Sequence, residues 1–279
     1  MSEPALAPMA DGRAIPELGI GLYLVEEERA EQVVLDALEA GYRHVDTASF
    51  YGNETAVRRA LDGSGVAEDD VFITTKVWNS DHGRQNTRAA FEASMERLGL
   101  DVLDLYLIHW AVPSRQLYLP TWEALIELQE QGRVRSIGVC NFPAAQLREI
   151  IAATGVVPAL HQIELHPWFA QRELRALHAE YGIRTQAWSP LRRGRELLAD
   201  PVLTRIAAEH DATPAQITLA WHRAHGIATI PKSVTRSRII ENFASLDVQL
   251  SAADIAQIDA LDRPDGRTGS DPATMTRLD

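Results

Sequence analysis

Four polar residues lie at or just beyond the ends of three predicted strands, where a packed core would not place them. Asp46 and Tyr51 follow the first of these strands, Lys76 closes the second and His109 closes the third. Successive strand ends are 30 residues apart (46 to 76) and then 33 apart (76 to 109), which suits one strand plus one helix each. The spacing predicts parallel neighbouring strands, so an acid, a phenol, an ammonium and an imidazole are expected to meet at one edge of a sheet.

These residue types are suited to delivering one proton. A free phenol has a pKa of about 10, so a tyrosine alone is a poor acid and a poor base at neutral pH. A neighbouring ammonium lowers the pKa of a phenol, and a carboxylate keeps that ammonium charged and oriented. A neutral imidazole can hydrogen-bond a substrate carbonyl and fix its direction. The four would protonate an alkoxide forming from a carbonyl, and because none of them supplies a hydride, a cofactor must.

The elements that position these residues alternate along most of the chain as short β-branched runs and helical stretches. Thr213 and Ser251 stand where helix N-caps belong. The expected helices cover residues 28–40, 54–61, 86–98, 121–131, 144–153, 172–181, 201–210, 214–224, 235–243 and 252–261. The expected strands cover residues 43–47, 71–77, 104–109, 136–141, 159–164, 185–188, 228–230 and, as the last and shortest, 245–246.

Strands separated by helices must run parallel, and apolar runs of this kind are typical of a sheet covered on both faces. The pattern predicts an α/β fold, a (β/α)8 TIM barrel formed by a single domain over residues 1–279. An N-terminal β-hairpin turning at Asp11-Gly12 is expected to plug the barrel bottom. A doubly wound dinucleotide-binding sheet is the alternative. However, Gly19-Ile20-Gly21 precedes the first strand–helix unit and is not followed directly by a helix, so the expected fingerprint is absent there.

The composition bounds the class of protein. A net charge of −12 argues against a general nucleic-acid binder, although it allows a local basic pocket for a phosphate. The single cysteine, Cys140, excludes an internal disulfide framework and fits a reducing cytosol. No apolar run approaches the roughly 20 residues of a membrane span, and the N-terminus lacks signal-peptide features. We therefore expect a cytoplasmic protein, by default a monomer, that acts on a small molecule and has neither nucleic-acid nor membrane partners.

Six motifs recur in register with the expected strand ends. They are DTASFYGNE at 46–54, LIHW at 107–110, IGVCNF at 137–142, QIELHP at 162–167, WSPL at 188–191 and IPKSV at 230–234. With Lys76 between the first two, they resemble the aldo-keto reductase superfamily, and most closely its short bacterial members related to 2,5-diketo-gluconate reductases. The resemblance extends from about residue 10 to about residue 270.

This resemblance implies an NADP-dependent oxidoreductase that reduces an aldehyde or ketone to an alcohol, with a dicarbonyl or keto-sugar acid among the candidate substrates. It implies Tyr51 as the proton donor and Lys76 as the group that lowers the pKa of Tyr51. Asp46 would be the partner of Lys76, and His109 would orient the carbonyl.

The resemblance also implies a set of positions that bind NADPH. Because Ser233 precedes an expected helix start, a phosphate there would meet free backbone N–H groups and nearby cations, which favours NADPH over NADH. The implied positions are Asn141 and Gln162 at the nicotinamide carboxamide, Trp188 stacked on the nicotinamide, Ser189, Leu191 and Gly194 beside the pyrophosphate, Lys232, Ser233 and Arg238 at the 2′-phosphate, and Glu241 and Asn242 near the adenine.

Some positions depart from the pattern of the superfamily. Cys140 stands where serine is more common, so one hydrogen bond to the carboxamide would be weaker. Tyr23 lies near the place of a tryptophan in the substrate pocket, which Trp78 and Trp110 are also expected to line. Thr235 stands where close relatives can have arginine. The short polar tail 263–279 indicates an open pocket.

Two other functions remain open from the residues. A non-catalytic nucleotide-binding sensor or subunit of the same fold would have no need of Tyr51 beside Lys76. A barrel isomerase or aldolase would use Lys76 for a Schiff base and leave the nicotinamide-type residues without a purpose. Two histidine pairs, 161 with 166 and 222 with 225, lack a third ligand, so no metal site is expected.

Overall fold

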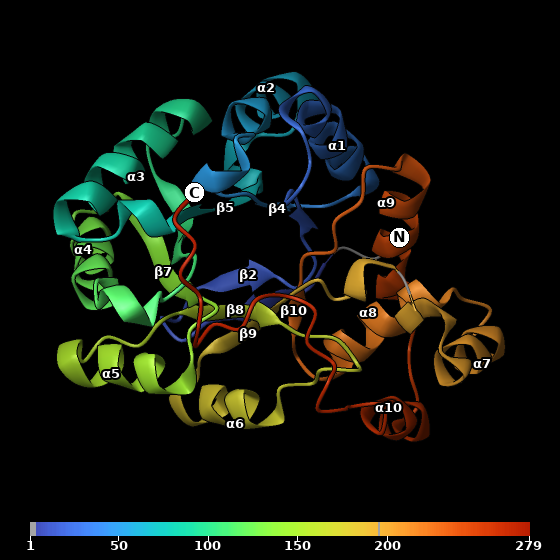
Figure 1. The fold of residues 1–279 in the computed structure, drawn as a ribbon. Coiled ribbons are helices and arrows are strands. Elements are labelled where there is room, and N and C mark those ends of the chain that lie inside the picture. The colour runs from blue at the N-terminus through green and yellow to red at the C-terminus, as the bar shows by residue number, and fades with distance from the viewer. Residues whose placement is uncertain (1–3, 195) are drawn as a thin grey trace.

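In the computed structural model, which describes residues 4–194 and 196–279, eight short strands form one parallel sheet. The sheet order is β10-β9-β8-β7-β6-β5-β4-β3, so each strand pairs with its neighbour in sequence (Figure 1). Ten α-helices of the described residues alternate with these strands and surround them. The strands are β3 (Ile20–Gly21), β4 (His44–Asp46), β5 (Phe72–Val77), β6 (Leu103–Ile108), β7 (Val134–Cys140), β8 (Leu160–Glu164), β9 (Arg184–Trp188) and β10 (Ala228–Thr229).

The helices lie where the apolar spacing predicts them, to within a few residues at each end. Thr213 and Ser251 each form a capping box, with Gln216 and Asp254 respectively, which satisfies the first N–H groups of α8 and α10. The helices are α1 (Glu27–Ala40), α2 (Glu54–Ser64), α3 (Arg84–Leu98), α4 (Tyr118–Glu130), α5 (Ala144–Thr154), α6 (Arg172–Tyr181), α7 (Pro201–Glu209), α8 (Pro214–Ala224), α9 (Arg236–Phe243) and α10 (Ala252–Asp259).

The sheet closes on itself between its first and last strands. Leu18, just before β3, forms a parallel bridge with Thr229 of β10. Gly21 donates its N–H to the Pro231 carbonyl, and a Cβ on Gly21 would lie 2.7 Å from the Ile230 carbonyl oxygen. Only glycine therefore permits this approach of the two backbones. The predicted (β/α)8 barrel is confirmed.

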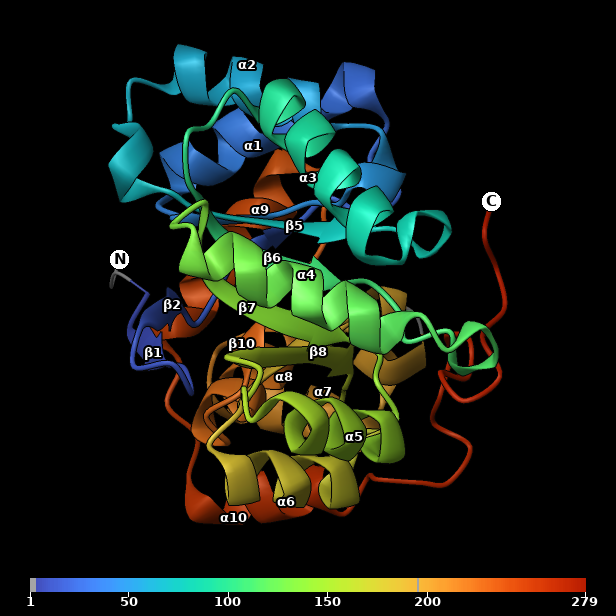
Figure 2. The same ribbon diagram turned by 90° about the vertical axis from the view of Figure 1, so that its left-hand side faces the viewer.

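The predicted hairpin is also present and lies at one end of the barrel (Figure 2). Strands β1 (Leu6–Pro8) and β2 (Ala14–Pro16) pair antiparallel. Met9 and Ile15 are buried in one cluster with Leu105 and Leu107 of β6 and Leu160 of β8. Hydrophobic burial of these two side chains holds the hairpin against the bottom of the barrel.

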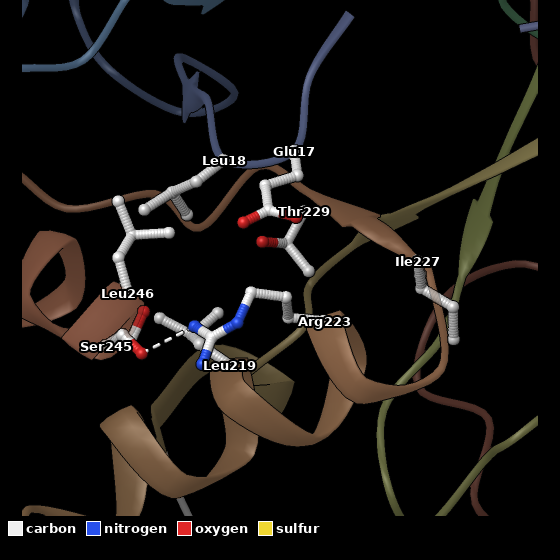
Figure 3. A pocket seen from close by; sticks show the side chains of 8 residues that line it. All are labelled: Glu17, Leu18, Leu219, Arg223, Ile227, Thr229, Ser245 and Leu246. Carbon is white, nitrogen blue, oxygen red and sulfur yellow. Dashed lines mark hydrogen bonds between the residues drawn. The ribbon is translucent and has the colours of Figure 1, made fainter. Parts of the chain in front are cut away.

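One predicted strand is wrong. Residues 245–246 lie in a 3-10 turn (Ala244–Asp247), and β3 is the strand that completes the barrel. Arg223 of α8 donates to the carbonyls of Ser245 and Val248, which holds this turn beside the closing seam. Figure 3 shows a small cavity there, with Glu17 on the opposite side from Arg223.

Within the described residues, none of the helices combines the length and apolar character that a membrane crossing requires.

Candidate active site

The four polar residues of the strand ends come together as the spacing predicts. Asp46 is the last residue of β4, Lys76 lies one residue before the end of β5, and His109 directly follows β6. Tyr51 ends a 3-10 turn (Ser49–Tyr51) that leads from β4 towards α2. Because β4, β5 and β6 are successive parallel neighbours, their carboxyl ends lie together at one mouth of the barrel.

A buried ion pair forms the base of this site. The Lys76 Nζ donates to Asp46 Oδ1 at 2.6 Å and to the Thr47 carbonyl at 2.9 Å, and both charged side chains are at most 1% exposed. The Tyr51 hydroxyl lies 3.4 Å from Lys76 Nζ and 3.4 Å from His109 Nε2. One phenol oxygen is therefore in contact with a cation and with a ring nitrogen.

Burial sets the protonation of these groups. Burial raises the pKa of Tyr51 well above that of a free phenol, and the Asp46 carboxylate adds to the rise. Burial and the charge of Lys76 lower the pKa of His109 well below its usual value, so the imidazole is neutral. Burial and Asp46 therefore outweigh any lowering of the pKa of Tyr51 by Lys76, and the role of Lys76 stays a prediction. Tyr51 thus keeps its proton at neutral pH.

Aromatic side chains line the space beside Tyr51. Phe50 stacks on Trp78 with ring centroids 3.8 Å apart, and Trp78 meets His109 edge-on at 5.0 Å. Tyr23 contacts the Tyr51 ring at 5.3 Å. Trp110 packs in the same cluster as Trp78 and Phe50. The sequence reasoning missed Phe50, although its position directly before Tyr51 offered a signal.

The C-terminal tail crosses the barrel mouth, at the opposite end from the hairpin (Figures 1 and 2). The Glu164 carboxylate, at the end of β8, accepts hydrogen bonds from the N–H groups of Thr268 and Gly269. Farther on, the Trp78 indole donates to the Leu278 carbonyl, and Met275 is buried against the aromatic cluster. The tail therefore lies against the barrel mouth and the aromatic cluster, and the open pocket stays a prediction.

The two amide side chains expected at the carboxamide lie beside the four polar residues. Gln162 Nε2 donates to Asp46 Oδ2 and to Gln186 Oε1, each at 2.7 Å. Asn141 Nδ2 donates to the His109 carbonyl at 3.1 Å, and Asn141 Oδ1 accepts from the Trp188 indole at 2.8 Å. These contacts hold both amides at the barrel mouth in fixed orientations.

The loop after β9 contains the residues expected beside a pyrophosphate. Ser189 and Gly194 have left-handed backbones, with φ of 47° and 65°. The Ser189 carbonyl accepts from the N–H of Arg192, and the Leu191 carbonyl accepts from that of Gly194. Two successive tight turns therefore shape this loop around Leu191.

The segment between β10 and α9 contains Lys232 and Ser233 of the expected phosphate site, and the first turn of α9 contains Arg238. Lys232 and Arg238 are exposed, and Ser233 is buried with its hydroxyl accepting from the Thr235 N–H. Glu241 is half-buried and accepts from the Thr213 hydroxyl at 2.7 Å, while Asn242 is buried.

Arg29 of α1 is a further cation here, which the sequence reasoning missed. It donates to the Val234 carbonyl at 3.2 Å. Partial burial of its ammonium lowers the pKa of Lys232, and the positive charge of Arg29 lowers it further. No salt bridge within residues 4–194 and 196–279 involves Arg29, Lys232 or Arg238, whereas Arg236 pairs with acidic residues of α1.

The structure offers no group of three or more His, Cys, Asp or Glu side chains suited to a metal ion among the residues it describes. His161 contacts His178 instead of His166, and His225 bonds to Asp259.

Comparisons with known proteins point the same way as this geometry. A family model described as "Aldo/keto reductase family" matches residues 17–263. An aldo-keto reductase of Mycolicibacterium smegmatis is 52% identical over 265 residues, covering 95% of this chain and 96% of that protein. The methylglyoxal reductase DkgA of Escherichia coli (strain K12) is 44% identical over 273 residues, covering 98% of each. The crystal structure of an Asp-to-Ala mutant of Gox0644 in complex with NADPH is 43% identical, covers 99% of this chain and 100% of that one, and has a TM-score of 0.95.

Proposed function

This chain belongs to the aldo/keto reductase family, and we propose that it uses NADPH to reduce small carbonyl compounds, with α-dicarbonyls such as methylglyoxal as the leading substrate class. Relatives named methylglyoxal reductases, 44–45% identical over nearly the whole chain, support the substrate class. The NADPH complex of a 43% identical structure supports the cofactor.

One observation carries the proposal: the Tyr51 hydroxyl lies 3.4 Å from both Lys76 Nζ and His109 Nε2. A bound NADPH would supply the hydride to the carbonyl carbon. Tyr51 would donate its proton to the carbonyl oxygen, and the Lys76 ammonium would stabilise the phenolate that remains. The neutral His109 ring would hydrogen-bond the carbonyl and set its direction. The contacts of Lys76 with Asp46 and the Thr47 carbonyl use its nitrogen as a donor, which argues against a Schiff base.

The residues present fit the cofactor at both of its ends. Both N–H groups of the Gln162 amide are used within the protein. Its carbonyl oxygen, whose other contact is the Cys140 thiol at 3.6 Å, would therefore be the atom that accepts from a carboxamide NH2. Arg29, Lys232 and Arg238 bring positive charge to the first turn of α9 and lack carboxylate partners within the part of the chain that the structure describes. A 2′-phosphate would neutralise this charge.

The test follows NADPH absorbance after addition of methylglyoxal, a keto-sugar acid or an aromatic aldehyde, with NADH in parallel. We expect consumption of NADPH that is fastest with the dicarbonyl, and weaker activity with NADH. NADPH binding without turnover of any of these carbonyls would favour the non-catalytic nucleotide-binding alternative. Equal activity with both cofactors would contradict the assignment of the phosphate site.

A further inference from the structure

Two fully buried histidines lie behind the cofactor-binding amides and outside the group of four polar residues. His161 belongs to β8 and His178 to α6, and both are at most 1% exposed. His161 Nδ1 and His178 Nε2 are 2.8 Å apart, and the two rings cross at 60°. Nothing in the proton-delivery chemistry uses this pair.

The neighbouring donors and acceptors fix where each ring carries its proton. The Phe142 backbone N–H can only donate, and it donates to His161 Nε2 at 3.0 Å. A neutral His161 must then carry its proton on Nδ1 and donate to His178 Nε2. His178 in turn carries its proton on Nδ1 and donates to the Thr185 hydroxyl at 2.8 Å. One arrangement of protons satisfies every contact.

Both rings are neutral at physiological pH. Burial lowers the pKa of His161 well below its usual value, and proximity to His178 lowers it further. Burial, with a smaller effect of the Arg175 charge, lowers the pKa of His178 to about 4. The chain of hydrogen bonds from Phe142 to Thr185 therefore has one fixed direction and joins the segment after β7 to β8, α6 and β9.

The first donor of this chain directly follows Asn141. Asn141 has a left-handed backbone with φ of 54°, a conformation that is uncommon for residues other than glycine, although asparagine adopts it more readily than most. Surrounding contacts must hold such a conformation. The side chain of Asn141 is held by the His109 carbonyl and Trp188, and the peptide that follows it is held by His161.

We propose that His161 and His178 are positioning residues for Asn141. By accepting the Phe142 N–H, His161 fixes the Asn141–Phe142 peptide and with it the amide that would hold the nicotinamide carboxamide. His178 keeps the proton of His161 on Nδ1, and so keeps Nε2 free to accept. This inference rests on the proposed function, because it assumes that Asn141 binds the cofactor.

The test compares three variants by NADPH titration and by turnover with methylglyoxal. His161→Leu removes the acceptor, and His161→Gln restores one, since its amide oxygen stands as many bonds from Cβ as Nε2 does. His222→Leu is the control, because His222 is equally buried but bonds to the carbonyls of Thr218 and Leu165.

We expect His161→Leu to raise the NADPH dissociation constant about tenfold, as suits a buried N–H left without its acceptor. His161→Gln should recover most of that affinity, and His222→Leu should lower the melting temperature without changing affinity. The proposal is overturned if His161→Leu binds NADPH like the wild type, if glutamine is no better than leucine, or if His222→Leu weakens binding as much.

A second measurement does not depend on the function. The nitrogen chemical shifts of the wild-type histidine rings report which nitrogen is protonated. Protons on Nδ1 of both His161 and His178 support the chain of hydrogen bonds, whereas an Nε2-protonated His161 overturns it. Failure of the proposed function would appear differently, as a wild-type protein that neither binds NADPH nor reduces a carbonyl.

Discussion

The Tyr51→Phe substitution removes the proposed proton donor and leaves the packing around it in place. Phenylalanine keeps the ring that packs against Tyr23 and His109 at centroid distances of 5.3 and 5.5 Å. It removes only the two long contacts of the hydroxyl, each 3.4 Å, while Lys76 retains its bonds to Asp46 and the Thr47 carbonyl. Contacts of this length contribute little to stability, so we expect a loss of at most about 1 kcal/mol.

The effect on turnover should be much larger. A positioned general acid contributes about 100- to 10,000-fold, which corresponds to about 3 to 5 kcal/mol of the activation barrier. Steady-state NADPH consumption with methylglyoxal measures this loss, while NADPH titration and thermal unfolding measure what is retained. The control is Tyr181→Phe, a half-buried tyrosine of α6 outside the site. A Tyr51→Phe protein that turns over within about threefold of the wild type would refute the assignment of the proton donor.

Three further substitutions test other parts of the site. Arg29→Ala should weaken NADPH binding about tenfold and leave NADH binding unchanged. The control is Arg59→Ala, which removes an arginine from a surface salt bridge. Equal losses of affinity for both cofactors would contradict a role of Arg29 at the phosphate. Asp46→Asn should lower the free energy of unfolding, measured in urea, by about 3 to 5 kcal/mol, because it leaves the Lys76 ammonium buried without its partner. A loss of stability no larger than that of a surface substitution would contradict the importance of this ion pair. Burial alone would raise the pKa of Glu164, but its hydrogen bonds hold it below the usual 4.5. The tail attachment should therefore be at full strength above pH 4.5 and be lost as the pH falls through the lower pKa of the folded protein. Limited proteolysis of the tail at decreasing pH measures this loss, and Glu164→Gln should show it at neutral pH.

The strand ends were predictable because their position follows from local pattern. Each apolar run has a definite last residue, and parallel strands separated by helices must place those residues at one edge. Asp46, Lys76 and His109 therefore meet as the spacing predicts. Tyr51 belongs with them because the chain makes a single 3-10 turn after β4.

The strand that the sequence reasoning missed, β3, has no local sequence pattern that would identify it. Strand β3 contains only Ile20 and Gly21, too few residues for a period of two to be visible, and its pairing with the far end of the chain depends on barrel closure. Residues 245–246 follow an expected helix, where an eighth strand would belong, but they lie after α9 in a tight turn held by Arg223. Whether β3 or residues 245–246 form the eighth strand depends on how the sheet closes, and the local sequence does not show this.

Long-range partners explain the other omissions. Arg29 lies 205 residues from its contact with Val234, so on its own helix it looks like an ordinary exposed arginine. The tail likewise depends on a carboxylate more than a hundred residues earlier in the chain, Glu164, whose bonds to Thr268 and Gly269 span 104 and 105 residues. For Arg29 and for Glu164, the sequence shows the residue type, but only the fold shows which residues lie next to it.

A single carboxylate connects the two halves of the proposed reaction. Asp46 Oδ1 accepts from Lys76, which contacts the proposed proton donor, and Asp46 Oδ2 accepts from Gln162, which we propose binds the carboxamide. Because Gln162 donates its two N–H groups to Asp46 and Gln186, the orientation of its amide is fixed, and so is the direction of its carbonyl oxygen. Asp46 therefore sets the orientation of the ammonium and of the cofactor-binding amide together. For this reason the Asp46→Asn variant should lose NADPH affinity as well as turnover, whereas Tyr51→Phe should lose turnover alone.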